Sequence, residues 1–156
     1  MEGEALLIGI GTFAIGVAGF SAVAASLRHG APAWTPGHSL RVRAIVSTSF
    51  NVAFESVVPL IAVAALGDPI AAVRVASILT ATYALAVVLL RLRQILAMGA
   101  YRARSVQILM ILGPLSVTLF LISALVPVSI AAYALALCVQ LGVAAFSFYS
   151  LIATTT

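Results

Sequence analysis

The sequence has few charged residues. Of its 156 residues, 8% are charged and 63% are hydrophobic. A soluble domain keeps about a quarter of its residues charged, because water must cover its surface. The composition therefore excludes a soluble protein and indicates an integral membrane protein covered by lipid. A chain of this length is expected to form one domain.

Residues that commonly carry catalysis or bind metals are also scarce. The chain has four acidic residues, two histidines and one cysteine. His29 and His38 share one loop with no third or fourth ligand near them, which argues against a metal site. No two acidic residues are placed to share a catalytic site. The single cysteine, Cys138, excludes a disulfide within the chain. We therefore expect no enzyme, no cofactor and no metal.

What the sequence does contain is long apolar runs. They predict an all-α, polytopic membrane protein with five spans, each long enough for a hydrocarbon core of about 30 Å. The predicted spans are residues 4–27, 40–66, 70–92, 105–126 and 129–152. Thr35 and Pro36 are typical of the start of a helix, as are Asp68 and Pro69, so helices are expected to begin there. A single long helix broken near Pro127 is an alternative to the last two spans.

The arginines predict the orientation of the chain. There is no lysine, and seven of the eight arginines lie in the connections after the first and third spans. The positive-inside rule places both connections in the cytoplasm, with the N-terminus outside and the C-terminus inside. No basic face on a soluble surface is present for nucleic acid to bind. The lipid bilayer is the expected partner.

The second predicted span carries a polar stripe. At about 100° per residue, Thr48, Asn51 and Glu55 fall on one side of a helix, with Arg41 and Pro59 on the same line. Glu55 lies near the middle of the span. A charge at that depth is costly in lipid and normally faces protein or water. This side of the helix is therefore expected to turn away from lipid.

Glu55 has a structural and a functional interpretation. In the structural one, the carboxyl group hydrogen-bonds to a polar side chain at similar depth on another helix. The candidate partners are Gln140, Ser116, Thr80 and Thr82. Such bonds average only about 0.6 kcal/mol, so stability alone is a weak reason to place a glutamate there.

In the functional interpretation, Thr48, Asn51 and Glu55 line a path for cations or protons, with Glu55 as the selectivity or protonation site. Arg41 and Arg43 would lie at its cytoplasmic mouth. Five helices leave little room for a pore, so the path would need several copies with the second helix facing a shared axis. A homo-oligomeric cation or proton channel is the function that this interpretation predicts. In it, Pro59 supplies a hinge or frees a backbone carbonyl.

Two other functions stay open. The first is a non-catalytic accessory or effector subunit, which would pack against a larger complex through a small-residue face of the first span. That face consists of Gly11, Ala14, Ala18, Ala22 and Ser26. The second is a small proton-coupled transporter that works as a homodimer around Glu55.

Part of the sequence is similar to known membrane proteins. The segment GFSAVAASL, followed by AWTPGHSLRVRA and an apolar run with a central polar residue, resembles small bacterial inner-membrane proteins with no assigned activity. The similar region covers roughly residues 8–66. The resemblance implies a multi-pass protein of a prokaryotic inner membrane and no particular substrate.

Overall fold

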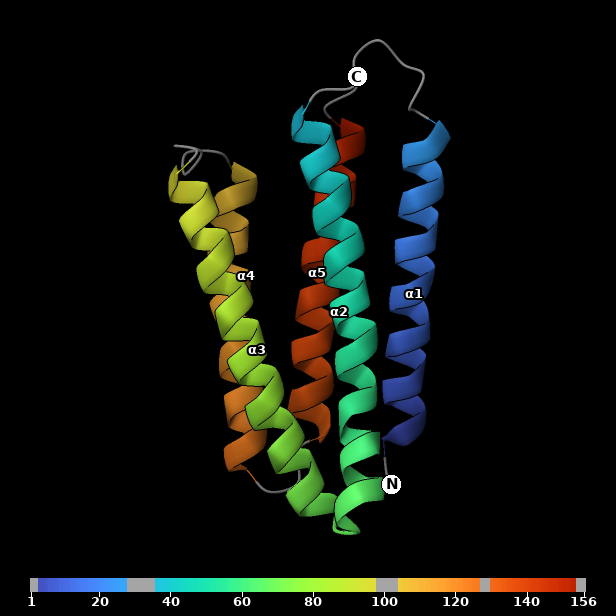
Figure 1. The fold of residues 1–156 in the computed structure, drawn as a ribbon, viewed down its shortest axis with the longest axis vertical. Helices are drawn as coiled ribbons and strands as arrows, with labels where there is room; N and C mark the ends of the chain where they lie inside the picture. The colour runs from blue at the N-terminus through green and yellow to red at the C-terminus, as the bar shows by residue number, and fades with distance from the viewer. Residues whose placement is uncertain (1–2, 28–35, 98–103, 127–129, 154–156) are drawn as a thin grey trace.

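The computed structural model describes residues 3–27, 36–97, 104–126 and 130–153. These residues form five helices in the order α1 (Glu4–Leu27), α2 (Pro36–Leu66), α3 (Pro69–Ala97), α4 (Arg104–Leu125) and α5 (Ile130–Ala153). The helices run alternately up and down in one elongated bundle, so that the two termini lie at opposite ends (Figure 1).

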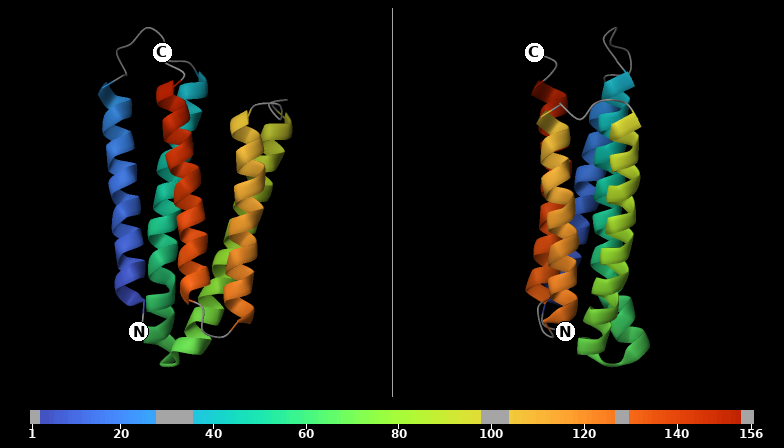
Figure 2. Two further views of the ribbon diagram at one scale, coloured as in Figure 1. Left: turned by 180° about the vertical axis from the view of Figure 1, so that it is seen from behind. Right: turned by 90° about the vertical axis from the view of Figure 1, so that its left-hand side faces the viewer.

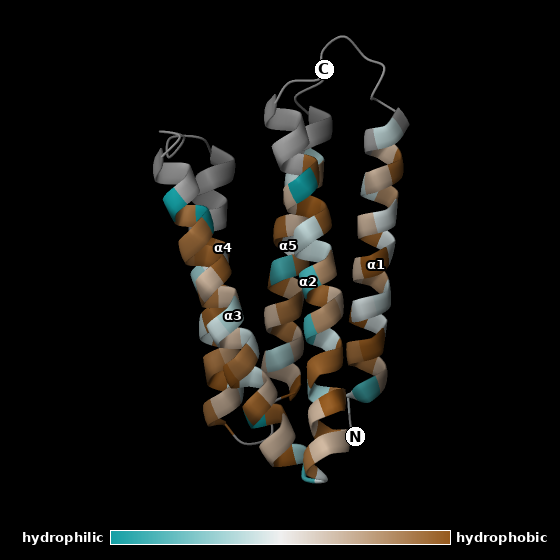
Figure 3. Ribbon diagram, in the orientation of Figure 1, coloured by the Kyte–Doolittle hydropathy of each residue, from teal (hydrophilic) through white to brown (hydrophobic). Residues whose placement is uncertain are grey.

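The surface of this bundle is apolar. Within the described residues, four helices contain stretches long and apolar enough to cross a membrane, and α4 contributes a shorter one. These stretches are Glu4–Ala24, Val42–Leu66, Pro69–Arg93, Ile130–Tyr149 and, in α4, Ile111–Leu125. Hydrophobic residues follow each other along all five helices (Figure 3), and many large ones are exposed, including Phe54 at 69%. An exposed apolar surface of this extent suits lipid. The protein is a helical, membrane-embedded protein.

Local chemistry sets the helix boundaries. α2 begins at Pro36, where the sequence predicts a start. Asp68 caps α3, because its Oδ1 accepts a 2.9 Å hydrogen bond from the N–H of Ile70. Gly67 has a φ of +68°, a conformation that residues with a side chain rarely adopt, and so allows the tight turn between α2 and α3.

The end of α3 differs from the predicted one, and the break between α4 and α5 settles a question that the sequence left open. α3 continues to Ala97, beyond its predicted end at residue 92. α4 and α5 are separate helices that pack against each other, which rules out one long broken helix. The connection at Pro127 and the loop with His29 lie outside the described residues.

The helices are arranged in two layers. α1, α2 and α3 form one layer, and α4 and α5 form the other (Figure 2). α2 is central, since it packs against α1, α3 and α5. α3 and α4 diverge together from α2 and α5. The separation is widest at the end of the bundle where α3 ends and α4 begins (Figure 1).

Small residues bring α1 close to α2. Gly11, Ala14 and Ala18 are all buried. A Cβ atom at Gly11 would collide with the hydroxyl of Ser56 on α2. Much of the small-residue face that an accessory subunit would offer to a partner is therefore covered within the chain, while Ala22 and Ser26 remain exposed.

Candidate functional site

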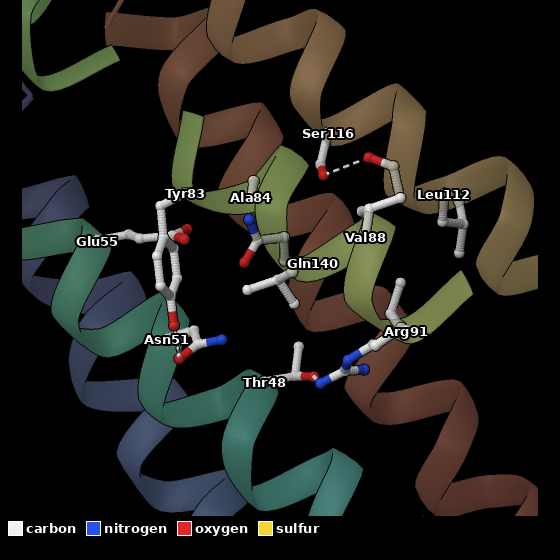
Figure 4. Close-up of a pocket in the computed structure, with 13 residues that line it drawn as sticks. Thr48, Asn51, Glu55, Tyr83, Ala84, Val88, Arg91, Leu112, Ser116 and Gln140 are labelled. Atoms are coloured by element: carbon white, nitrogen blue, oxygen red, sulfur yellow. Dashed lines mark hydrogen bonds between the residues drawn. The ribbon is translucent and has the colours of Figure 1, made fainter. Parts of the chain in front are cut away.

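A cavity of about 60 Å³ lies between α2, α3, α4 and α5, lined by apolar side chains such as Val87, Val88 and Leu112 as well as by polar ones, for which it is called the polar cavity. Its polar lining is Thr48, Asn51, Glu55, Tyr83, Arg91, Ser116 and Gln140 (Figure 4). One water molecule needs about 10–15 Å³ of such space, so the cavity has room for a few. The predicted stripe of α2 thus lines a space within a single chain.

Glu55 lies at the deep end of this cavity. Its side chain is 1% exposed, so it points into protein and not into lipid. The side-chain amide of Gln140 on α5 hydrogen-bonds to the carboxyl group. The second carboxyl oxygen, Oε2, is buried without a hydrogen-bond partner. A buried carboxylate oxygen without a donor is unfavourable, so this atom favours a bound proton or cation.

A packed layer closes the cavity beyond Glu55. Tyr133 on α5 and Phe120 on α4 are fully buried and meet edge to face, with ring centroids 5.0 Å apart. Thr80 on α3 donates to the backbone carbonyl of Ala76, and its hydroxyl lies 3.3 Å from that of Tyr133. On α3, α4 and α5, the cavity-lining residues lie on one side of this layer only. The cavity therefore leads away from Glu55 in one direction.

Pro59 frees the backbone carbonyl of Glu55. A proline has no N–H, so the usual helical bond from residue 59 to the carbonyl four residues earlier is absent. The hydroxyl of Tyr133 donates a 2.7 Å hydrogen bond to that carbonyl instead. The sequence predicted either a hinge at Pro59 or a carbonyl freed toward the path, and it did not reveal that a tyrosine of α5 would bind this carbonyl.

Arg91 lies at the other end of the cavity and was missed by sequence reasoning, which assigned it to a juxtamembrane connection. Its guanidinium donates to the hydroxyls of Ser47 at 3.1 Å and Thr48 at 3.2 Å, and so joins α3 to α2. Thr48 and Glu55 are seven residues apart, which is about 10 Å along a helix. The positive group is therefore well separated from the carboxyl group.

A second polar contact joins α2 and α3 between these two ends. The hydroxyl of Tyr83 donates a 3.0 Å hydrogen bond to Oδ1 of Asn51. Tyr83 is also partly exposed at the outer surface of the bundle. The seam between α2 and α3 is thus the thin wall of the cavity.

Of the remaining predicted residues, one lines the cavity and one lies outside it. Ser116 lines the cavity, but its hydroxyl bonds to the carbonyl of Gly113 in its own helix at 2.8 Å. Arg43 is exposed and does not line the cavity. The side chain of Arg41 lies outside the described part of the chain, so its place at the mouth stays a prediction.

One buried pair was not predicted. Ser77 on α3 bonds to Ser123 on α4 at 3.1 Å. Serine is common in these spans, so the sequence did not single out these two. The bond holds α3 and α4 together on the closed side of the bundle.

The protein was compared with protein-family models, curated proteins and solved structures, and none of them matches. The chemistry of the cavity therefore carries the functional inference. The cavity holds one carboxyl group, two amides, three hydroxyls and one guanidinium, and of these the carboxyl group can bind and release a proton or a monovalent cation. Within the described ranges, no three His, Cys, Asp or Glu side chains gather where they could hold a metal ion.

Proposed function

We propose that the protein is a small proton-coupled membrane transporter in which Glu55 exchanges a proton for a cationic substrate. The observation that carries this proposal is the position of one carboxyl group at the closed end of a polar cavity, with one oxygen unpartnered. Ionisable groups inside a membrane commonly mark proton and substrate pathways.

A cavity that ends at a packed layer fits a carrier better than a channel. A carrier exposes its binding site to one side of the membrane at a time. A channel needs a continuous path, whereas the layer of Tyr133 and Phe120 is fully packed. The described conformation corresponds to one of the two states of such a carrier. Transport requires a second state in which this layer separates and the cavity near Arg91 closes.

The homo-oligomeric channel expected from the sequence would place the stripe of α2 on an axis shared by several copies. One observation weighs against that arrangement: Thr48 and Glu55 are buried within their own chain.

We further propose that the bundle crosses a prokaryotic inner membrane five times, with the N-terminus outside and the C-terminus in the cytoplasm. α1, α3 and α5 end, and α2 and α4 begin, at the same end of the bundle (Figure 1). Most of the arginines belong to the sequence near that end, which favours the cytoplasm. The cavity would then open to the cytoplasm.

Proton movement in liposomes tests the transport proposal. The full-length protein is reconstituted with a pH-sensitive dye inside, and single inorganic and organic cations are added outside. We expect proton movement that starts only when a transported cation is added and that Glu55→Gln abolishes. Glu4→Gln is the matched control, because it removes an exposed acid at the start of α1 and leaves the cavity intact.

The other outcomes separate the alternatives. Proton or cation flux that depends on Glu55 but needs no exchange partner would indicate a channel. An accessory subunit would be indicated if neither the unaltered protein nor Glu55→Gln moved protons or any added cation. A different protein should then co-purify with the chain in fixed ratio.

A further inference from the structure

A second, larger hollow borders Glu55 on the side away from Arg91. It is a groove of about 500 Å³ between the second half of α2 and the first half of α3. Its lining is mostly apolar and includes Phe54, Val58, Ile61, Val75 and Leu79. Pockets for drug-sized ligands span about 300–1,000 Å³, so the groove has the size for a whole organic molecule.

The groove faces the lipid side of the bundle. Phe54 and Leu79, on its two walls, are 69% and 59% exposed. A hydrophobic molecule dissolved in the membrane could therefore enter between α2 and α3 without crossing the polar cavity.

Glu55 belongs to both spaces. Glu55 and Tyr83 line the groove as well as the polar cavity. Glu55 is 1% exposed and its Oε2 is buried, so the carboxyl group lies behind the surface of the groove, and a ligand reaches it only when side chains of the groove wall move aside. A ligand in the groove and a proton from the cavity would then compete for the same carboxyl group.

The polar groups of the groove restrict its ligand. They are Glu55, Thr80 and Tyr83, and the lining includes no cationic side chain, which excludes an anionic ligand. Hard metal cations need about six oxygen ligands, whereas the side chains of the groove supply oxygens from these three residues alone. An organic cation needs only one opposite charge, apolar walls and aromatic rings such as those of Phe54 and Tyr83.

We propose that the groove between α2 and α3 binds hydrophobic monovalent organic cations, with the charged centre against the Glu55 carboxylate and the apolar body against the groove walls. This inference rests on the proposed function, since it names the substrate class of the same carboxyl group. The exchange step is balanced: the cation pairs with the carboxylate as the carboxyl O–H breaks, and the proton leaves to water in the polar cavity.

Cation binding should therefore weaken as pH falls, because protonation removes the negative charge. The titratable or charged groups around Glu55 are Tyr83 and Arg91 on α3 and Tyr133 on α5. Among the described residues that line the cavity, α4 contributes no such group.

Equilibrium binding of tetraphenylphosphonium to the purified full-length protein tests this proposal. Triphenylphosphine oxide is the neutral control of similar shape, and tetramethylammonium is the charged control without an apolar body. We expect Glu55→Gln to weaken tetraphenylphosphonium binding by at least about tenfold, since it removes the only opposite charge in an apolar site. Ala65→Trp, which fills the groove outside the polar cavity, should weaken it as well, whereas Glu4→Gln should not.

Two results would overturn the inference: equal binding by the unaltered protein and Glu55→Gln, or binding of the neutral analogue as tight as that of the cation. Either would mean that the groove holds lipid chains or other apolar matter. Its failure is distinguishable from failure of the transport proposal. Glu55-dependent proton exchange with inorganic cations alone would keep the transporter and reject this substrate. Glu55-dependent binding without any proton movement in liposomes would keep the site and reject transport.

Discussion

Tyr133 on α5 donates a 2.7 Å hydrogen bond to the backbone carbonyl of Glu55 on α2. The carbonyl is free because Pro59 cannot donate to it. A tyrosine 78 residues away in the chain therefore fixes the turn of α2 that carries the carboxyl group. The site depends on packing between α2 and α5 as well as on the residues of α2.

This relationship predicts a specific coupling between two substitutions. Tyr133→Phe removes the donor and leaves a buried carbonyl unpaired, so it should lower the free energy of unfolding by about 1 kcal/mol. Pro59→Ala restores the helical N–H to the same carbonyl. In that background Tyr133→Phe should have little effect, which unfolding in detergent mixtures can measure as a double-mutant cycle.

Tyr149→Phe is the control for this cycle, because Tyr149 lies on the same helix and is exposed. It should leave stability unchanged in both backgrounds. An equal loss from Tyr133→Phe with and without Pro59 would show that the hydroxyl acts through another contact, such as the hydroxyl of Thr80 at 3.3 Å, and not through the carbonyl of Glu55.

The contact between α1 and α2 gives a second prediction. Gly11→Ala places a methyl group against the hydroxyl of Ser56, which bonds to the carbonyl of Ala53 at 2.8 Å. Either the serine or the helix must shift, so the free energy of unfolding should fall by about 1 kcal/mol or more. Gly16→Ala is the matched control, since its Cβ would meet nothing within 4 Å. Equal effects of the two substitutions would contradict the close approach of α1 to α2.

Features that depend on local chemistry could be predicted from the sequence. Pro36 and the Asp68–Pro69 pair mark helix starts because their signals act within one turn. The spacing of Thr48, Asn51 and Glu55 places them on one face wherever α2 lies. These arguments need no knowledge of the neighbouring helices.

Features that depend on the arrangement of helices could not be predicted from the sequence. Gln140 was recognised as a polar residue at depth, but its pairing with Glu55 needs the packing of α5 on α2. In the sequence, Arg91 resembles an ordinary interfacial arginine. Its side chain reaches the cavity because α3 packs beside α2. The divergence of α3 and α4 from α2 and α5 has no signal in composition, so the sequence did not reveal a cavity within one chain.

The cavity extends from Glu55 toward Arg91, while Tyr133 and Phe120 are packed on the other side, and this arrangement predicts one-sided chemical access. In a Cys138→Ser background, Asn51→Cys should react with a membrane-impermeant thiol reagent added at the arginine-rich end of the bundle, which we expect to be cytoplasmic. It should react much more slowly from the other side. Ser77→Cys, at a fully buried position on the closed side, is the control and should react from neither side. Equal labelling of Asn51→Cys from both sides would indicate a continuous pore.

The central claim is that Glu55 takes up and releases a proton, and the infrared band of its protonated carboxyl group measures this most directly. The band should be present at low pH, disappear reversibly as pH rises, and be missing from Glu55→Gln at every pH. A Glu55 band that stays constant over the whole range would contradict the claim, because it would mark a carboxyl group that serves only to hold helices together.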